Sequence, residues 1–563
     1  MIGLTRDKGD RGTLQAGPML NAYPDSLGGS LGDIVKLLTE HDFQDVFQSF
    51  YILPSVFNTD LDRGFSVIDY ELNEMLASPD DLQALKKEGI AFKFDFILNH
   101  ASVLSRQFQD IIRNGEQSEF TDFFIDWNTF WQDCGELTPE GYIQPRADLI
   151  QDMFFRKPGL PILNVRFPDG REVPYWNTFY QEVKYRLLDA QDLTVTLSVQ
   201  YSTADALARL INQAIAAGQK PRDIDFGRFH AYRQPVIEMM ESNRRYLGQM
   251  DLNIRSPLVW QFYKSTLEKL AAYGAEIVRL DAFAYAPKEP GAKNFLNEPG
   301  TWELLGRIKD LADPLGITLL PEIHARYEEK IHEKLSAQGY MTYDFFLPGL
   351  IIDAFEGQSV DTLVRWIKEL QDKQIRTVNM LGCHDGIPLL DLKGLLPDEQ
   401  IERLIQIVVA RGGSIKDLHG QKNTYYQVNA TYFSALGEDE NKLLLARAIQ
   451  VFMPGKPQIW YLDLFAGKND YDAVAKAGPG GHKEINRTNL SIDQVHELMH
   501  RDVVQKQLDL LRFRNTSPAF GLDASLQILE SEPWILKLRW ENRGVQATLE
   551  ANLRDITYKI TTQ

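Results

Sequence analysis

One pattern recurs along most of the chain: a short apolar run that ends in polar or acidic residues. Eight such runs are candidate strands, at 19–25, 47–55, 90–100, 275–281, 317–324, 340–348, 375–385 and 457–467. The segments 256–274 and 300–316 have helical periodicity, and each ends at a glycine suited to a helix C-cap. Alternating strands and helices predict an α/β fold with a parallel sheet, and eight repeats favour a closed (β/α)8 TIM barrel over an open sheet.

Two long stretches interrupt this rhythm. Residues 101–250 separate the third strand from the fourth, much further than a normal strand-to-helix connection, so we expect an inserted domain with an extra helical segment at about 182–246. Residues 500–563 alternate apolar and polar side chains around the turn-like stretch ENRG, which predicts a small C-terminal antiparallel β domain. The barrel would then comprise residues 1–100 and 251–499.

Charge and hydropathy narrow the range of partners. The formal net charge of −18 argues against a nucleic acid or an anionic membrane surface. No run of eighteen apolar residues occurs, which excludes a membrane-spanning helix, and the amino terminus lacks an apolar core of signal-peptide length. The chain has only two cysteines, Cys134 and Cys383, for which we expect buried free thiols in the cytoplasm rather than a disulfide.

The polar ends of the predicted strands are candidate functional residues, because catalytic side chains of such barrels lie at the carboxyl ends of the strands. These residues are His100, Asp281, Glu322, His324, His384 and Asp385. A single acid in this position often only caps the next helix. Three acids that converge on one mouth would repel each other, and this cost favours a catalytic interpretation.

Paired carboxylates are typical of retaining glycosidases. One carboxylate attacks the anomeric carbon, and the other donates a proton to the leaving oxygen. Arg279 lies two residues before Asp281 and therefore faces the same side of its strand. Its guanidinium would keep Asp281 ionised, so we interpret Asp281 as a nucleophile rather than a cap.

The motifs around these residues resemble a known family. VRLDAFAY, LLPEIH and GCHDG resemble the catalytic motifs of the α-amylase superfamily (glycoside hydrolase family 13). YPDSLGG, DRGFSVIDY, FILNH, WNTF, YYQVNATYFSALG, LFAGKND and EINR narrow the resemblance to its sucrose phosphorylase branch, over nearly the full chain. The resemblance implies Asp281 as nucleophile, Glu322 as acid/base and Asp385 as the acid that holds sugar hydroxyls and stabilises the transition state. It implies a substrate site made of Asp62, Phe65, His100, Phe179, Gln249, Arg279, His324, His384, Tyr426, Gln427 and Arg487.

The resemblance also bears on metals. Amylases of this superfamily often hold a structural calcium, whereas the phosphorylase branch generally does without one, so the resemblance implies no metal and no cofactor. His100, His324 and His384 could instead form a zinc set, but their barrel positions and acidic neighbours favour contacts with sugar hydroxyls. Lys288 and Glu289, in the loop after the nucleophile, are interpreted as a solvated pair.

A phosphorylase must admit phosphate in preference to water, which requires hydrogen-bond donors on the leaving-group side. FFRKPGLP resembles the family's phosphate-contacting segment and supplies Arg156 and Lys157. The loop 411–430 contains TYYQVN, which resembles the mobile acceptor loop and adds Tyr425; Thr424 stands where typical sucrose enzymes have an Asp. The loop also carries Lys416, His419 and Lys422. It is therefore either a solvated loop or a site for an acceptor with a negative charge.

The resemblance implies a retaining α-glucoside phosphorylase, a hexosyltransferase that cleaves sucrose or a sucrose-like α-glucoside with inorganic phosphate. The product would be α-D-glucose 1-phosphate, formed through a β-glucosyl-enzyme, and the acceptor would be fructose, fructose 6-phosphate, glycerol or glycerate. A retaining α-glucosidase or transglucosidase, using water or another hydroxyl, is the alternative. A non-catalytic barrel is a further one, although all three acids are present. We expect a monomer or homodimer with no nucleic-acid or membrane partner.

Overall fold

The computed structural model describes residues 16–156, 159–417, 425–478, 480–521 and 524–563. The chain divides into two compact units. The first consists of Met1–His100, Pro145–Gly159 and Leu252–Gln563, and the second of Ala101–Gln144 and Leu160–Asp251.

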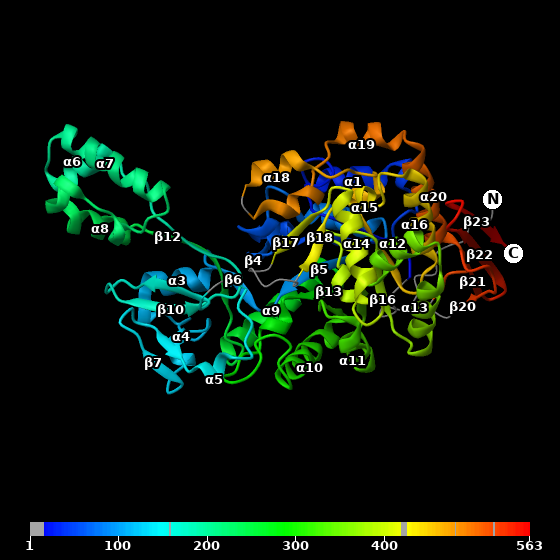
Figure 1. Ribbon diagram of the computed structural model, residues 1–563, viewed down its shortest axis with the longest axis horizontal. Helices are drawn as coiled ribbons and strands as arrows, with labels where there is room; N and C mark the ends of the chain where they lie inside the picture. Colours follow the sequence, from blue (N-terminus) through cyan, green and yellow to red (C-terminus); the bar gives the residue numbers. More distant parts are fainter. Residues whose placement is uncertain (1–15, 157–158, 418–424, 479, 522–523) are drawn as a thin grey trace. The chain divides into compact units, whose positions relative to one another are not determined.

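Eight parallel strands form the centre of the first unit (Figure 1). They are β1 (Met19–Ala22), β2 (Ser49–Ile52), β5 (Ala91–Ile97), β13 (Ala275–Asp281), β14 (Thr318–Pro321), β15 (Thr342–Asp344), β16 (Thr377–Met380) and β19 (Lys456–Trp460). Their hydrogen-bonded order, β14-β13-β5-β2-β1-β19-β16-β15, follows the chain around a near-closed barrel whose two end strands are β14 and β15. Each strand lies within one of the eight predicted runs or within one residue of it, and the (β/α)8 prediction is confirmed.

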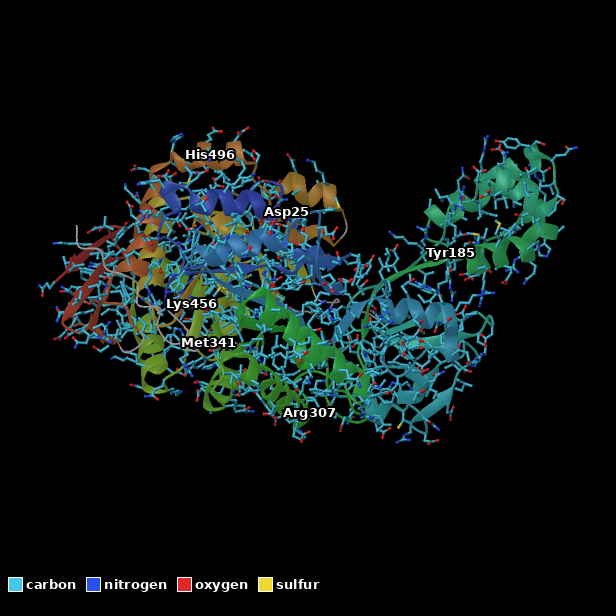
Figure 2. All side chains as sticks on the ribbon, turned by 180° about the vertical axis from the view of Figure 1, so that it is seen from behind. Asp25, Tyr185, Arg307, Met341, Lys456 and His496 are labelled. Atoms are coloured by element: carbon cyan, nitrogen blue, oxygen red, sulfur yellow. The ribbon has the colours of Figure 1, made fainter. Side chains whose placement is uncertain are left out.

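The strands are rich in apolar residues because both of their faces are covered. Every residue of β1, β2, β16 and β19 is buried. Lys456, labelled in Figure 2, begins β19 and donates a hydrogen bond to the Gly17 carbonyl at 3.0 Å, so that even its buried ammonium has a partner. The interior of the barrel is therefore packed, and buried polar residues in it such as Lys93 also have partners, here Gln458 at 2.7 Å.

Helices surround this barrel, and their ends follow local rules. α9 (Pro257–Tyr273) stops at Gly274, whose φ of 99° is a left-handed conformation that glycine adopts without strain. α10 (Gly300–Ala312) continues through a short 3-10 turn to Gly316, with φ 72°. Both predicted glycine caps are confirmed. The remaining long helices of the barrel layer include α1 (Leu31–Thr39), α2 (Pro79–Lys87), α11 (Ile331–Ala337), α13 (Asp361–Asp372), α14 (Asp398–Ala410) and α16 (Glu440–Phe452).

The C-terminal part begins with a helix rather than a strand. α20 (Asp502–Thr516) precedes an antiparallel sheet of β20 (Ser525–Ile528), β21 (Ile535–Asn542), β22 (Val545–Asn552) and β23 (Thr557–Thr562). The β domain expected over residues 500–563 thus starts about where α20 ends. The ENRG stretch is the predicted hairpin turn: Arg543 and Gly544 have φ of 49° and 85°, the left-handed conformation that a two-residue hairpin needs.

The second unit contains antiparallel strand pairs and a helical segment. β9 (Ile162–Arg166) pairs with β10 (Glu172–Trp176), and β11 (Gln181–Lys184) pairs with β12 (Arg245–Asp251). The chain leaves β11 at Tyr185, labelled in Figure 2, and forms α6 (Ala190–Leu197), α7 (Tyr201–Ala216) and α8 (Arg233–Ser242) before it returns to β12. These helices enclose an apolar core of their own, which includes Leu193, Leu207, Ile211, Phe226 and Val236. The helical segment lies where the sequence placed it.

Residues 145–159 group with the barrel and not with the insertion predicted over 101–250. Hydrogen bonds explain this difference. The Asn294 side chain bonds both the amide and the carbonyl of Phe154, at 2.8 Å each, and Gly291 donates its amide to Leu149 at 3.0 Å. Among the described residues, no helix has the length and apolar character required to cross a membrane.

Candidate active site

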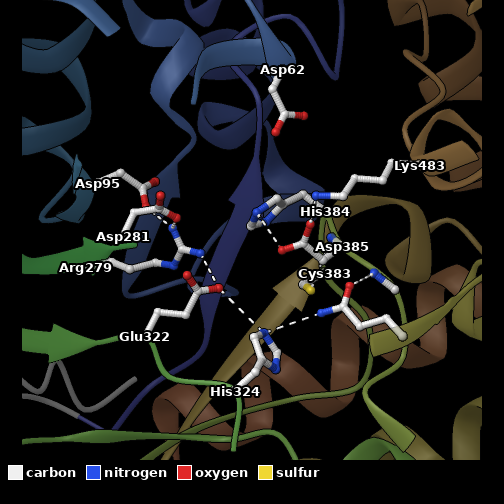
Figure 3. Close-up of polar contacts among 12 residues, drawn as sticks. Asp62, Asp95, Arg279, Asp281, Glu322, His324, Cys383, His384, Asp385 and Lys483 are labelled. Carbon is white, nitrogen blue, oxygen red and sulfur yellow. Dashed lines mark hydrogen bonds and ion pairs between the residues drawn. The ribbon is translucent and has the colours of Figure 1, made fainter. Parts of the chain in front are cut away.

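Three acids lie together at the carboxyl end of the barrel (Figure 3). Asp281 is the last residue of β13, Glu322 follows β14 directly, and Asp385 lies in the loop after β16. Their side chains are 13–15% exposed, so each is mostly buried yet reachable from solvent. The parallel sheet explains the convergence, because the carboxyl ends of all its strands meet at one mouth.

Arg279 is bonded to two of these acids. Its guanidinium lies 2.8 Å from Oδ1 of Asp281 and 2.5 Å from Oε1 of Glu322. It also pairs with Asp95 of β5, which is fully buried and accepts a hydrogen bond from the Tyr51 hydroxyl at 2.7 Å. A single buried cation thus links the two carboxyl groups and anchors them to the interior of the barrel.

The two carboxyl groups differ in proton affinity. Burial raises the pKa of Asp281 well above its usual value; the charge of Arg279 opposes this shift, and the charge of Glu322 adds to it. Burial acts against ionisation of Glu322 as well, but the charges of Arg279 and His324 outweigh it and lower the pKa of Glu322 to about 2. Arg279 therefore favours ionisation of Asp281, as expected from the sequence, and burial opposes it.

His324 lies on the other side of Glu322. Its Nδ1 is 2.9 Å from Oδ2 of the buried Asp391, and its Nε2 is 3.6 Å from Oε1 of Glu322. Gln427 of β18 (Tyr425–Asn429) places its Nε2 3.4 Å from the same ring nitrogen. Although burial opposes the shift, Asp391 and Glu322 raise the pKa of His324 to about 10.

Asp385 is surrounded by donors. Lys483 Nζ lies 2.6 Å from its Oδ1, His384 Nε2 lies 3.2 Å from its Oδ2, and Arg487 lies 3.8 Å away. Burial acts against ionisation, but the charges of Lys483 and Arg487 and the hydrogen bond from Lys483 lower the pKa of Asp385 well below its usual value. Burial lowers the pKa of His384 to about 3. At neutral pH, Asp385 is thus a carboxylate that accepts hydrogen bonds and His384 is a neutral ring.

The predicted substrate residues of the first unit gather around this acid. Phe65 stacks on His384 with ring centroids 4.9 Å apart, and its carbonyl lies 3.0 Å from Nε2 of His100. Arg487 bonds the His384 carbonyl at 2.8 Å and lies 3.5 Å from Asp62. The structure therefore brings a flat aromatic face and several donors and acceptors to one side of the acid cluster, which suits a sugar ring.

The structure places the other predicted residues as follows. Arg156 donates to the Tyr285 hydroxyl at 3.2 Å. Phe179 and Gln249 belong to the second unit and not to the barrel. Tyr425 and Tyr426 lie in β18, and Lys157 and Thr424 lie outside the described residues.

Comparison with known proteins identifies the family. No protein-family model matches the chain. The chain is 50% identical over 552 residues to the sucrose 6(F)-phosphate phosphorylase of Ilumatobacter coccineus, covering 96% of this chain and 95% of that one. It is 31% identical to the sucrose phosphorylase of Streptococcus mutans, with 96% and 97% covered. The chain belongs to the sucrose phosphorylase branch of glycoside hydrolase family 13.

A solved structure agrees with this assignment. The sucrose 6F-phosphate phosphorylase from Thermoanaerobacter thermosaccharolyticum superimposes with a TM-score of 0.79 and 30% identity, over 98% of this chain and 96% of that one. The protein is accordingly a glycoside phosphorylase, which transfers a glucosyl group from an α-glucoside to phosphate and forms glucose 1-phosphate.

Four polar residues of this phosphorylase received no role at the site from the sequence: Asp95, Lys288, Asp391 and Lys483. Lys288 is not the solvated residue expected. It is 5% exposed and donates to Oδ1 of Asn99 at 2.9 Å and to the Tyr285 carbonyl at 2.6 Å, so it ties the loop after the nucleophile to the end of β5. An acid within an apolar strand was the available signal for Asp95; the other three lie in loops or a short 3-10 turn and gave none.

Two groups of described side chains have potential metal-ligand atoms within 4.8 Å of one another: Cys383, His384 and Asp385, and His332, Glu333 and Glu369. Cations already neutralise the acids of both. Lys483 pairs with Asp385, and Lys373 pairs with Glu333 and Glu369 at 2.7 and 2.9 Å. These contacts suit an ion-pair network better than a metal site. Both cysteines are free thiols, Cys383 buried and Cys134 partly exposed.

Proposed function

We propose that this phosphorylase cleaves sucrose 6F-phosphate and releases fructose 6-phosphate. The relative that is 50% identical over nearly the whole chain bears this activity in its name. The acceptor segment of this sequence carries the supporting chemistry: Thr424 replaces an acid of typical sucrose enzymes, and Lys416, His419 and Lys422 precede it. An acceptor segment that has lost an acidic side chain and carries basic ones favours an acceptor that bears a phosphate group.

The proposed reaction is a double displacement. The Asp281 carboxylate attacks the anomeric carbon of the glucosyl group, and the bond from that carbon to fructose breaks. Glu322 gives its proton to the leaving oxygen. Phosphate then attacks the same carbon, Glu322 takes the proton of the attacking phosphate oxygen, and Asp281 is released as a carboxylate.

The protonation of the unliganded pair sets a requirement for this reaction. Burial raises the pKa of Asp281, whereas the charges of Arg279 and His324 outweigh burial and lower that of Glu322. The first step requires an ionised Asp281 and a protonated Glu322. Substrate binding must therefore leave the proton on Glu322, whose pKa would rise when the glucosyl group separates it from Arg279.

We assign the glucosyl group to the side chains that surround Asp385. Phe65 offers it an aromatic face, while Asp62 and Arg487 reach the far hydroxyls. His384 contacts both Phe65 and Asp385, and His100 contacts the Phe65 carbonyl. The ionised Asp385, with Lys483 at 2.6 Å, supports a role in holding sugar hydroxyls and in stabilising positive charge at the anomeric carbon.

The test supplies the purified protein with α-glucose 1-phosphate and one acceptor at a time: fructose, fructose 6-phosphate, glycerol, glycerate or water. Phosphate release is measured. We expect release with fructose 6-phosphate to exceed that with fructose by at least about tenfold, because hydrogen bonds to a charged group contribute about 1.5–3 kcal/mol. Faster release with unphosphorylated fructose would assign sucrose as the substrate. An equally slow rate with every acceptor would replace phosphorolysis by hydrolysis.

The same proposal includes a location and an assembly. A cytoplasmic location is supported by the two free cysteines, since disulfides are rare in that compartment. The assembly is proposed as a monomer or a homodimer, which sedimentation of the purified protein would distinguish.

A further inference from the structure

Asp391 is a buried acid beside the candidate site that the proposed mechanism does not use. It lies in the short 3-10 turn Leu389–Leu392 and is 5% exposed. A buried carboxylate is costly unless it is paired. Its described partner is His324, whose Nδ1 lies 2.9 Å from Oδ2. Figure 3 shows the other edge of that imidazole turned toward Glu322.

The surroundings leave His324 one orientation. Its ring stacks on Phe345 with centroids 3.9 Å apart, and Asp391 fixes Nδ1. Nε2 then faces Glu322 at 3.6 Å and the amide nitrogen of Gln427 at 3.4 Å, since the Gln427 oxygen accepts from the Gly386 amide at 3.0 Å. A proton on Nε2 is therefore donated to Glu322 and not to Gln427, whose amide nitrogen is itself a donor. A carboxylate on one nitrogen that orients an imidazole and stabilises its protonated form is a known device of enzymes.

The charges that face His324 among the described residues are few. Asp391 faces it from the 3-10 turn and Glu322 from the end of β14, while Phe345 and Gln427 are neutral. Both acids favour the imidazolium and burial opposes it; the result is a pKa of about 10. The Asp391–His324 pair is neutral overall. Its positive group, the imidazolium, faces Glu322 and the acceptor, and its negative group, the Asp391 carboxylate, is buried at the opposite edge of the ring.

We propose that Asp391 is a positioning residue of the acceptor site: it orients His324 and holds a protonated Nε2 toward the leaving group, and so makes the site selective for an acceptor with a negative charge. The inference rests on the proposed function, in which the acceptor is fructose 6-phosphate. The nearer, positive end of the pair dominates at the acceptor because Coulomb energy falls with distance.

The first experiment compares Asp391→Asn with the wild type. The readout is kcat/KM for phosphate release from α-glucose 1-phosphate, with fructose 6-phosphate and with fructose, between pH 5.5 and 8.5. We expect the variant to lose at least about tenfold with fructose 6-phosphate, mainly through KM, and clearly less with fructose. Asp353→Asn is the matched control, because Asp353 is 7% exposed and accepts a hydrogen bond from Gln400, away from His324. The control should retain both rates within about twofold.

The pH profile separates positioning from mere stability. The wild-type imidazolium persists to about pH 10, so activity with fructose 6-phosphate should not decline through neutrality by loss of this charge. Without the Asp391 charge the pKa of His324 falls toward its ordinary 6.5 or below, because burial is then opposed only by Glu322. The variant should therefore regain activity below about pH 6 and lose it as the pH rises. An equal loss with both acceptors and an unaltered pH profile would reduce Asp391 to a structural residue and overturn the proposal.

A second measurement does not depend on the folding of a variant. The wild-type protein, with its 10 histidines labelled in the ring, gives an NMR signal for His324 that is assigned by its disappearance in His324→Gln. A protonated ring at pH 8 supports the proposal, and a neutral ring there overturns it. If the wild type does not prefer fructose 6-phosphate, the proposed substrate and the selectivity fail together. The ring charge and the pH profile with the best acceptor would still decide whether Asp391 positions His324.

Discussion

Arg279 explains how several acids can occupy so small a volume. It bonds Asp281 and Glu322 at the mouth of the barrel and Asp95 in its interior, and none of these acids is more than 15% exposed. Removal of a buried cation would leave these charges uncompensated, whereas neutralisation of one acid would relieve repulsion. Repulsion between the acids thus costs stability, and catalysis requires the arrangement. We therefore expect that a single acid of the site can be replaced without loss of the fold.

Asp281→Asn tests this view. We expect turnover to fall by roughly four orders of magnitude or more, as for other catalytic nucleophiles. The free energy of unfolding should stay the same or increase, because the variant removes a carboxyl group whose pKa is already raised by burial. Steady-state phosphate release and thermal unfolding at pH 7 give both numbers. Substantial residual turnover would remove Asp281 from the nucleophile role, and a large loss of stability would contradict the electrostatic argument.

The sequence identified the acids at strand ends but not the residues that position them. Asp391, Lys483 and Lys288 bond partners that lie 67, 98 and 189 residues away along the chain. Local pattern carries no information on such pairs. The acids themselves were visible because each follows an apolar strand, and a parallel barrel forces all strand ends to one mouth.

At the scale of elements, the buried strands and the helices that end at a glycine could be predicted because the residues that determine them are neighbours in the sequence. Gly274 and Gly544 adopt left-handed conformations that their sequence context predicts. α20 was missed because its sequence was taken with the alternating pattern that follows it. Its buried residues, among them Val504, Leu508 and Leu511, in fact recur at helical spacing.

The helical segment α6–α8 supplies a prediction at this scale. Arg244 is 6% exposed and joins Glu172 of β10, at 3.0 Å, to Glu241 of α8, at 2.9 Å. Arg244→Met would leave the buried Glu241 with only a distant Arg222, 3.9 Å away, as its described ion-pair partner, and should cost about 3 kcal/mol. Hydrogen exchange of residues 185–244 should accelerate. Arg186→Met is the control: its pair with Asp192 is exposed, at 3.5 Å, and contributes about 0–1 kcal/mol. Equal hydrogen-exchange rates in both variants would show that the ion pairs of Arg244 with Glu172 and Glu241 do not stabilise the helical segment.

At the scale of the whole molecule, the question is whether the C-terminal sheet is an independent domain, as a sequence boundary near residue 500 implies. The contacts argue against independence. The Trp540 indole of β21 donates to the Phe452 carbonyl at the end of α16 at 2.8 Å. Its ring lies 5.3 Å from the guanidinium of Arg514 in α20, which itself bonds the Val451 carbonyl at 2.8 Å. Sheet and barrel therefore share one buried layer.

Trp540→Ala should consequently destabilise the barrel and not only the sheet. Loss of a large buried aromatic side chain costs about 3–5 kcal/mol, and here the Phe452 carbonyl also loses its donor. We expect phosphorolytic activity and the far-ultraviolet signal to be lost together, at a lower temperature than in the wild type. Trp534→Ala is the control, since Trp534 is only partly buried and packs against Arg554 within the sheet region. If activity outlasts a first unfolding step in Trp540→Ala, the sheet is a separate folding unit and the shared layer does not couple it to the barrel.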